Sequence, residues 1–389
     1  MKLHAGTPEQ AGISPSAVDL IHERGQEWID KGMHSALVLL AVRKGVIFLN
    51  DAFGQRSQGD EPGSLPLNTI FPLASITKII TVTAAMTLVE EGRLGLNRPV
   101  QEYIPEFQGK NKEKVMVHQL MTHTAGIDDE AVFQAINKKE DEEIDLPARE
   151  ASAHPTLHRW LHIGLSIPLI LYPGTEMLYS GFGIQLLGEI LRRLSGQSLD
   201  DYARDRIFHP LGMRDTFYSI PEDVRQRVVI HAEEGPYAEE NDPSIQERPS
   251  PSGGAFSTAM DAAVFGQMFL NKGTYDGKRV LSPAGVSVMT RNQLPGISAR
   301  LLTEVYPEAS WGLGWSVNHA YKGQVYGEAL PSNSTFLHTG GGGVLLWVDP
   351  ALEIVGVYFS TELSTNEDGL HVWNADLFMN MVSASVEDT

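Results

Sequence analysis

Two pairs of apolar segments at opposite ends of the chain most constrain its fold. Ala36–Val42 and Val46–Leu49 flank Arg43-Lys44-Gly45 near the N-terminus, and Val344–Val348 and Ile354–Phe359 flank Asp349-Pro350 near the C-terminus. Each pair is typical of a β-hairpin. Because consecutive residues of the first pair are apolar, we expect its strands to be covered on both faces. The two hairpins are predicted to join in one antiparallel sheet, with the chain between them inserted as a second lobe.

The chain between the hairpins has helical patterns. Ile76–Glu91 is apolar almost all round and ends at Gly92, which predicts a buried central helix with a glycine C-cap. Further helices are expected at 15–32, 184–194, 199–207 and 369–382. The predicted fold class is α+β, an antiparallel sheet flanked by helices (residues 1–65 and 255–389) with a mostly helical lobe (66–254). Two polar insertions in that lobe, 138–150 and 233–252, are expected to be surface loops, the second a candidate lid.

Composition and charge exclude several classes of function. The chain has 389 residues, with 30 basic and 49 acidic side chains and a net charge of −19, so we expect no nucleic-acid partner. The absence of cysteine excludes disulfides, thiolate nucleophiles and cysteine-ligated zinc. No apolar run reaches the ~18–20 residues that span a bilayer, and residues 1–8 lack the apolar core of a secretory signal. We therefore expect a cytoplasmic protein without a membrane partner, unless a leader was trimmed; no feature predicts an oligomeric state.

The clearest chemical signal is Ser75-Ile76-Thr77-Lys78 at the start of the predicted buried helix. Positions i and i+3 share a helix face, so the Lys78 amine should lie beside the Ser75 hydroxyl. Burial favours the neutral amine, which can take the serine proton and activate the hydroxyl. Alone, the motif is also compatible with a capping serine and a surface lysine.

Two later segments could contribute to the same site. Tyr179 lies in a turn before the helix at 184–194, where its phenol could reach a cavity or simply pack at an interface between lobes. His338-Thr339-Gly340-Gly341 precedes the strand at 344–348, and its glycines would let a ligand approach the backbone closely. The alternative for this second segment is a flexible entry to the hairpin.

The order of these motifs resembles the serine β-lactamase and penicillin-binding protein superfamily. The resemblance is closest to the class C-like branch, with class C β-lactamases, family VIII carboxylesterases and D-aminopeptidases. Five further segments carry it: Phe71–Ala74, Leu120–Gly126, Tyr172–Thr175, His209–Met213 and Trp311–Trp315. The resemblance implies a β-lactamase/transpeptidase-like fold. It also implies that Ser75 is the acylated nucleophile, Lys78 its general base and Tyr179 a second proton-transfer group.

The same resemblance implies an oxyanion hole from the backbone N–H groups of Ser75 and Gly341, and substrate contacts from His338, Thr339, Gly340 and Gly181. Two departures matter. The family's Tyr-x-Asn is Tyr179-Ser180-Gly181, which lacks the amide that contacts acylamide substrates. The family's Lys-Thr-Gly is His338-Thr339-Gly340, and a histidine is largely neutral above its usual pKa of about 6.5.

Both departures weaken recognition of substrates with a carboxylate and favour simple acyl esters. The sequence therefore predicts a serine hydrolase, foremost a carboxylesterase on short acyl esters. A D-aminopeptidase or weak β-lactamase is one alternative, and a penicillin-binding or sensing protein that is acylated without turnover is another. The expected partner is a small acyl ester or amide.

Other constellations are weaker. His154, His158 and His162 recur every fourth residue, but Pro155 interrupts them and no carboxylate is in register, so a solvated helix face is favoured over a metal site. His123 is expected to be structural. There is no Gly-x-Ser-x-Gly elbow and no phosphate-binding glycine pattern, so no cofactor is expected.

Overall fold

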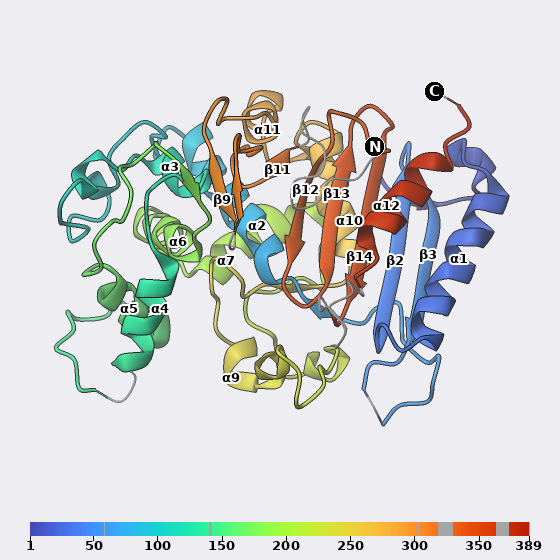
Figure 1. Cartoon of the computed structure of the whole chain (residues 1–389), viewed down its shortest axis with the longest axis horizontal. Coiled ribbons are helices and arrows are strands. Elements are labelled where there is room, and N and C mark those ends of the chain that lie inside the picture. The colour runs from blue at the N-terminus through green and yellow to red at the C-terminus, as the bar shows by residue number, and fades with distance from the viewer. Residues whose placement is uncertain (58, 140–141, 302–303, 318–329, 363–372, 389) are drawn as a thin grey trace.

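The computed structural model describes the chain except residues 58, 140–141, 302–303, 318–329, 363–372 and 389. Its main sheet has the strand order β1-β3-β2-β14-β13-β12-β11 (Figure 1). The strands are β1 (His4–Ala5), β2 (Ala36–Arg43), β3 (Val46–Gly54), β11 (Ser316–Val317), β12 (Phe336–Gly340), β13 (Val344–Asp349) and β14 (Ile354–Ser360). The predicted hairpins β2–β3 and β13–β14 join through antiparallel pairing of β14 with β2, which confirms the predicted sheet.

Helices cover both faces of this sheet. α1 (Pro15–Asp30) and α12 (Ala375–Ala384) lie on one face, and α10 (Ala259–Leu270) on the other (Figure 1). Alternate residues of β2 enter different cores: Leu37, Leu39 and Ala41 pack with the first two helices, and Val38, Leu40 and Val42 with the opposite side. This two-sided burial explains the uninterrupted apolar run in the sequence.

A mostly helical lobe lies beside the sheet. Its helices are α2 (Thr77–Glu90), α3 (Val117–Met121), α4 (Asp129–Lys138), α5 (Pro155–Gly164), α6 (Gly181–Ser195), α7 (Leu199–Ala203), α8 (His209–Leu211) and α9 (Pro243–Gln246). Residues Thr77–Leu88 of α2 are all buried, as the apolar pattern predicts, and α2 packs against α6. The α+β fold class is therefore confirmed, while the domain boundaries at 65/66 and 254/255 stay predictions.

Several element boundaries differ from expectation. The helix expected at 184–194 begins earlier, at Gly181, because Ser180 caps it by accepting from the Gly183 N–H. The helix expected at 199–207 is α7 followed by a π-helical segment, Arg204–Phe208. The C-terminal helix is α12, and residues 369–372 of the expected range lie outside the described residues.

Short elements connect the two parts of the molecule. β4 (Phe71–Pro72) pairs with β6 (Phe256–Ser257), β7 (Thr274–Tyr275) with β8 (Lys278–Arg279), and β9 (Ala299–Leu301) with both β5 (Met177–Leu178) and β10 (Glu304–Tyr306). α11 (Pro283–Met289) lies above β9 and β11 in Figure 1. Among the described residues, none of the helices combines the length and the apolar composition needed to cross a membrane.

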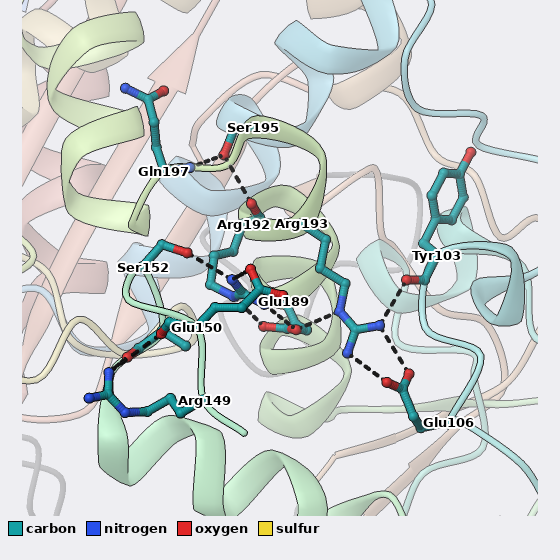
Figure 2. Close-up of polar contacts among 11 residues, drawn as sticks. Tyr103, Glu106, Arg149, Glu150, Ser152, Glu189, Arg192, Arg193, Ser195 and Gln197 are labelled. Atoms are coloured by element: carbon teal, nitrogen blue, oxygen red, sulfur yellow. Dashed lines mark hydrogen bonds and ion pairs between the residues drawn. The ribbon is translucent and has the colours of Figure 1, made fainter. Parts of the chain in front are cut away.

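An ion-pair network at the C-terminal half of α6, called here the arginine cluster, consists of Glu106, Glu150, Glu189, Arg192 and Arg193 (Figure 2). Arg192 binds both carboxylate oxygens of Glu189 at 2.9 Å and one oxygen of Glu150 at 2.8 Å. Arg193 binds Glu189 and Glu106. Through Glu150 the cluster fastens the end of the first polar insertion to α6.

Candidate active site

Ser75 lies in a 3-10 turn, Ala74–Ile76, directly before α2. The segment before β6 holds this turn: the Leu73 N–H donates to the Ala255 carbonyl at 2.8 Å, and the Ala255 N–H donates to the Thr77 hydroxyl at 3.0 Å. Ala74 has a φ of +43°, in the left-handed region that residues other than glycine rarely adopt. Such strain persists only where the surrounding packing enforces it, and it concentrates at functional sites.

Lys78 lies one helical turn after Ser75, as the spacing predicts, and is only 4% exposed. Its amine donates to Ser75 Oγ at 2.9 Å and to the Ser252 carbonyl at 2.7 Å. Burial lowers the pKa of this amine to about 8, while the charge of Asp129 acts in the opposite direction. Among the described residues, the amine forms no salt bridge with a carboxylate. It can therefore lose its proton near neutral pH and accept one from the serine.

Tyr179 comes directly after β5 and lies against the amine, with the ring centroid 5.0 Å from Lys78 Nζ. Burial raises the pKa of its phenol, and a hydrogen bond with Ser75 acts against that rise. The phenol is therefore protonated at neutral pH and is a proton donor rather than a phenolate. The structure thus brings Ser75, Lys78 and Tyr179 together from two distant parts of the chain.

The His338-Thr339-Gly340 triplet is part of strand β12, where it pairs with β13 at Leu346, Leu345 and Val344. The alternative of a flexible hairpin entry is therefore wrong for these three residues. A Cβ at Gly340 would lie 2.4 Å from the Leu73 carbonyl and 3.1 Å from Ala74 Cβ. Only glycine allows this strand to pack so closely on the turn that carries Ser75.

The His338 side chain is buried and its Nδ1 lies 2.6 Å from the Thr339 carbonyl, so Nδ1 carries the proton. Burial and the charge of Lys78 lower the pKa of His338 to about 3, so it is neutral at physiological pH. Its ring belongs to an aromatic cluster with Tyr179, Trp311 and His123. Thr339 is buried as well.

Gly341 follows the triplet directly and packs against the second polar insertion. A Cβ there would be 3.3 Å from the ring of Tyr237, a residue of that insertion. The insertion ends at Ser252, whose carbonyl binds Lys78. It therefore reaches the site at two points, whereas the first insertion ends at the arginine cluster.

Sequence reasoning missed Asp129 and Ser252. Asp129 accepts hydrogen bonds from the Ser180 hydroxyl at 2.6 Å, from the Phe182 N–H at 3.1 Å and from the Gly181 N–H. Its only sequence signal is the acidic run Asp128-Asp129-Glu130 shortly after the Leu120–Gly126 segment. Ser252 contacts Lys78 through its backbone carbonyl. Every residue has such a carbonyl, so the residue type gives no signal in the sequence.

The histidines take several positions. His123, in the left-handed region at φ +57°, accepts from the Ser180 N–H through Nδ1 at 3.2 Å and lies 4.4 Å from the Tyr179 ring. Its assignment as structural stays a prediction. His154 precedes α5 as its N-cap residue, so the expected face of three histidines is wrong at that position. In the part of the chain that is described, no three histidine or acidic side chains are placed to hold a metal ion.

Comparisons with known proteins identify the family and the fold of the chain. Residues 25–378 match the family model described as Beta-lactamase. The chain is 28% identical over 366 residues to protein Rv1367c of Mycobacterium tuberculosis (strain ATCC 25618 / H37Rv), covering 86% of this chain and 87% of the relative.

Two solved structures share the fold. One is described as a novel penicillin-binding protein homologue from Caulobacter crescentus (TM-score 0.74, 21% identity, 97% of this chain and 99% of that chain). The other is described as a family VIII carboxylesterase (TM-score 0.71, 20% identity, 96% and 98%). With a family match over most of its length, this chain belongs to the β-lactamase family and is a serine hydrolase.

Proposed function

We propose that this protein is a carboxylesterase that hydrolyses short acyl esters through an acyl-enzyme on Ser75. The observation that carries the proposal is the buried pair of Ser75 Oγ and Lys78 Nζ, 2.9 Å apart, with an amine whose pKa is lowered to about 8. A nucleophilic serine needs a base within hydrogen-bond reach, and this amine meets that condition.

In acylation, Lys78 takes the Ser75 proton while Oγ bonds to the ester carbon. The resulting oxyanion is held by the backbone N–H groups of Ser75 and Gly341. The carbon–oxygen bond to the alcohol then breaks, and the departing oxygen receives a proton from the Tyr179 phenol, which Lys78 replenishes. Water repeats the sequence on the acyl-enzyme, so the net reaction converts an ester and water into an acid and an alcohol.

The preference for neutral esters is argued from His338 and Gly181. Because the pKa of His338 is lowered to about 3, the site offers no permanent cation where the family's Lys-Thr-Gly lysine would stand. Gly181 supplies no side-chain amide for an acylamide group. Recognition of penicillin-like or peptide-like carboxylates is therefore weakened, whereas a neutral ester needs only the nucleophile, the two proton-transfer groups and the oxyanion hole.

The test compares four probes on the same preparation. We expect rapid turnover of p-nitrophenyl butyrate and little hydrolysis of nitrocefin, and Ser75→Ala should lower the ester rate at least ~10⁴-fold. Release of p-nitroaniline from D-amino acid anilides at a higher rate would indicate a D-aminopeptidase, and faster nitrocefin hydrolysis a β-lactamase. A stable ampicillin adduct without turnover would indicate a penicillin-binding protein. Wild-type esterase activity in Ser75→Ala would overturn the nucleophile assignment itself.

A further inference from the structure

One face of helix α2 is hydrogen-bonded at three points to a single short stretch of chain, residues 251–255. The three bonds join Lys78 Nζ to the Ser252 carbonyl (2.7 Å), Thr81 Oγ1 to the Pro251 carbonyl (2.7 Å) and Thr77 Oγ1 to the Ala255 N–H (3.0 Å). Thr77 and Lys78 lie four and three residues before Thr81, so the three side chains share one side of the helix. Only the middle bond belongs to a group that exchanges protons with Ser75.

The Thr81 hydroxyl lies between two oxygen atoms, and its neighbours fix the direction of each bond. It is 2.7 Å from the Pro251 carbonyl and 2.7 Å from the Tyr218 hydroxyl. A carbonyl only accepts, so the single Thr81 proton goes to Pro251 and the Tyr218 phenol donates to Thr81. Both side chains are fully buried, and burial raises the pKa of the phenol, so it keeps its proton. Tyr218 therefore orients Thr81, and Thr81 holds the Pro251 carbonyl.

Pro251 is also held from the side of helix α6. A Cβ at Gly188 would lie 2.4 Å from Pro251 Cγ, so only glycine at that position lets the proline ring pack on the helix. The ring is thus packed on α6 while the carbonyl of the same residue is bound from α2. Because proline has a nearly fixed φ, these two contacts restrict the direction in which the chain continues to Ser252.

The Ser252 carbonyl affects both states of the Lys78 amine. Because a carbonyl only accepts, it takes one N–H of the neutral amine and helps to turn the lone pair towards Ser75 Oγ, 2.9 Å away. When the amine has taken the serine proton, the same bond becomes charge-assisted and stabilises the cation. The position of this carbonyl therefore influences the orientation of the base and its basicity.

We propose that Thr81 and Tyr218 are positioning residues for proton transfer: they hold Pro251 so that the next carbonyl, that of Ser252, orients the Lys78 amine towards Ser75. The proposal deepens the proposed function and rests on it, because it concerns the amine that takes the Ser75 proton. Both residues act through Lys78 rather than on the substrate.

The chain offers a matched control for Thr81 on the same helix. Thr87 is buried, donates to a backbone carbonyl and hydrogen-bonds to a tyrosine hydroxyl, that of Tyr202, at 2.8 Å. Its carbonyl acceptor is that of Ala84, within α2 itself, rather than residues 251–255. Thr81→Val and Thr87→Val thus remove the same hydroxyl from equivalent surroundings, and only the first removes a hydrogen bond to the segment that contacts Lys78.

The experiment measures kcat/KM for p-nitrophenyl butyrate against pH in both variants. We expect Thr81→Val to lower the plateau about tenfold or more, because the base is misaligned. The midpoint of the rise should move to lower pH by a few tenths to about one unit, because the protonated amine loses a charge-assisted bond. Thr87→Val should keep the midpoint and stay within about twofold of the plateau. Thr81→Ser, which keeps the hydroxyl, should restore the midpoint.

The shift of the midpoint is the measurement that a purely structural role would not produce. Four other titratable side chains act on the Lys78 amine or lie against it: Tyr179, His123, His338 and Asp129. Burial lowers the pKa of both histidines and raises the pKa of the phenol and of the carboxyl. Thr81→Val leaves all four in place, so a shift reports the bond between the amine and the Ser252 carbonyl.

Two results would overturn the inference. One is a pH profile of Thr81→Val that matches the unaltered protein, and the other is an equal loss in Thr81→Val and Thr87→Val with no shift of the midpoint. If Thr81→Val does not fold, Tyr218→Phe with Tyr202→Phe as its control makes the same comparison. A smaller shift in the same direction is then expected for Tyr218→Phe alone, and no difference between the two would overturn the inference.

A second probe separates this inference from the esterase proposal. With diisopropyl fluorophosphate, Ser75 Oγ bonds to phosphorus, the phosphorus–fluorine bond breaks, fluoride leaves and Lys78 takes the serine proton. The rate of adduct formation, followed by mass spectrometry, should show the same loss and the same shift in Thr81→Val. If this holds while p-nitrophenyl butyrate is not hydrolysed by the unaltered protein, the esterase proposal fails and the inference stands. If the ester is hydrolysed and neither reaction responds to Thr81→Val, the inference alone fails; if the unaltered protein does neither reaction, both fail.

Discussion

Two buried basic residues of the helical lobe, Lys78 and Arg192, have opposite electrostatic environments. Arg192 binds the carboxylates of Glu189 and Glu150, and these hydrogen bonds raise its pKa above the ordinary arginine value (Figure 2). In the described part of the chain, the Lys78 amine hydrogen-bonds only to a hydroxyl and a carbonyl, and burial lowers its pKa to about 8. A paired guanidinium cannot exchange its proton, whereas an unpaired buried amine can, so the same lobe contains one structural and one reactive cation.

Replacing Lys78 should have the largest effect on turnover, and it tests the assignment of Lys78 as the reactive cation. Lys78→Met should lower ester turnover by about 10³–10⁴-fold, because the base is removed. It should leave the free energy of unfolding at pH 7 no lower than before, since the charged amine costs the folded state up to about 3 kcal/mol at about 1.4 kcal/mol per pH unit of pKa shift.

The sign of this stability effect can be checked by pH. The folded pKa of about 8 lies below the ordinary 10.5, so the penalty is complete below pH 8 and disappears as pH rises towards 10.5. Urea unfolding of both proteins at pH 7 and pH 10 should therefore show the advantage of Lys78→Met shrinking at the higher pH. A marked loss of stability at pH 7 would contradict the description of Lys78 as an unpaired buried cation.

Arg192→Met makes the same change at the paired cation, and we expect the opposite result: a loss of stability with little loss of turnover. It leaves Glu189 with Arg193 alone and should lower the free energy of unfolding by roughly 2–4 kcal/mol, because breaking a buried ion pair strands its partner. Turnover per folded molecule should stay within about threefold, because the arginine cluster does not contact Ser75 or Lys78. Urea unfolding and kcat of the same preparations test both halves. If Arg192→Met lowered turnover as much as Lys78→Met does, the distinction between a structural and a reactive cation would be wrong.

The comparison also explains what could be predicted from the sequence. Ser75 and Lys78 are three residues apart on one helix, so their contact follows from helix geometry, and the apolar surroundings already indicated a shifted pKa. The two-sided sheet followed from uninterrupted apolar runs. Tyr179 and His338 could be assigned to the site only from the resemblance to a family. Both residues are far from Ser75 in the sequence, and only tertiary packing brings them to it.

Other parts of the site were beyond sequence reasoning for physical reasons. Asp129 reaches the site because the start of α4 docks on the first turn of α6, and no local pattern encodes that docking. Glu150 and Ser252 end two insertions of similar polar composition, yet one binds Arg192 and the other binds Lys78. Composition describes how polar a loop is and leaves open which part of the surface it touches.

The pH dependence of turnover should follow the reactive cation. Because Lys78 acts as a base only when neutral, kcat/KM for a neutral ester should rise about tenfold per pH unit up to about pH 8 and then level off. His338, with its pKa lowered to about 3, should contribute no step near pH 6.5. A pH–rate profile of p-nitrophenyl butyrate hydrolysis, corrected for spontaneous hydrolysis, gives the answer. A rise centred near 6.5 would instead assign the base to a histidine.

His338→Lys would place a second unpaired cation next to the first. Like charges disfavour each other's protonated form, so the rise in kcat/KM should move to a pH lower by a few tenths to about one unit. Activity on esters that carry a carboxylate should improve a few-fold relative to neutral esters, because a cation replaces the neutral ring. An unchanged substrate ratio would mean that this position does not face the substrate carboxylate. His338→Gln, which adds no charge, serves as the control for disturbed packing.

Glu150→Gln should have the smallest effect and tests the outer edge of the arginine cluster. The Glu150 side chain is 69% exposed and pairs with Arg192 at 2.8 Å, so its loss should cost at most about 1 kcal/mol of unfolding free energy, as for other surface ion pairs. Arg192 keeps its bidentate contact with Glu189 and its bond to the Ser152 hydroxyl, which is why the effect stays small. Turnover should be unchanged, because the insertion released by this substitution ends on α6 rather than at Lys78. A loss of turnover would show that both insertions act on the active site.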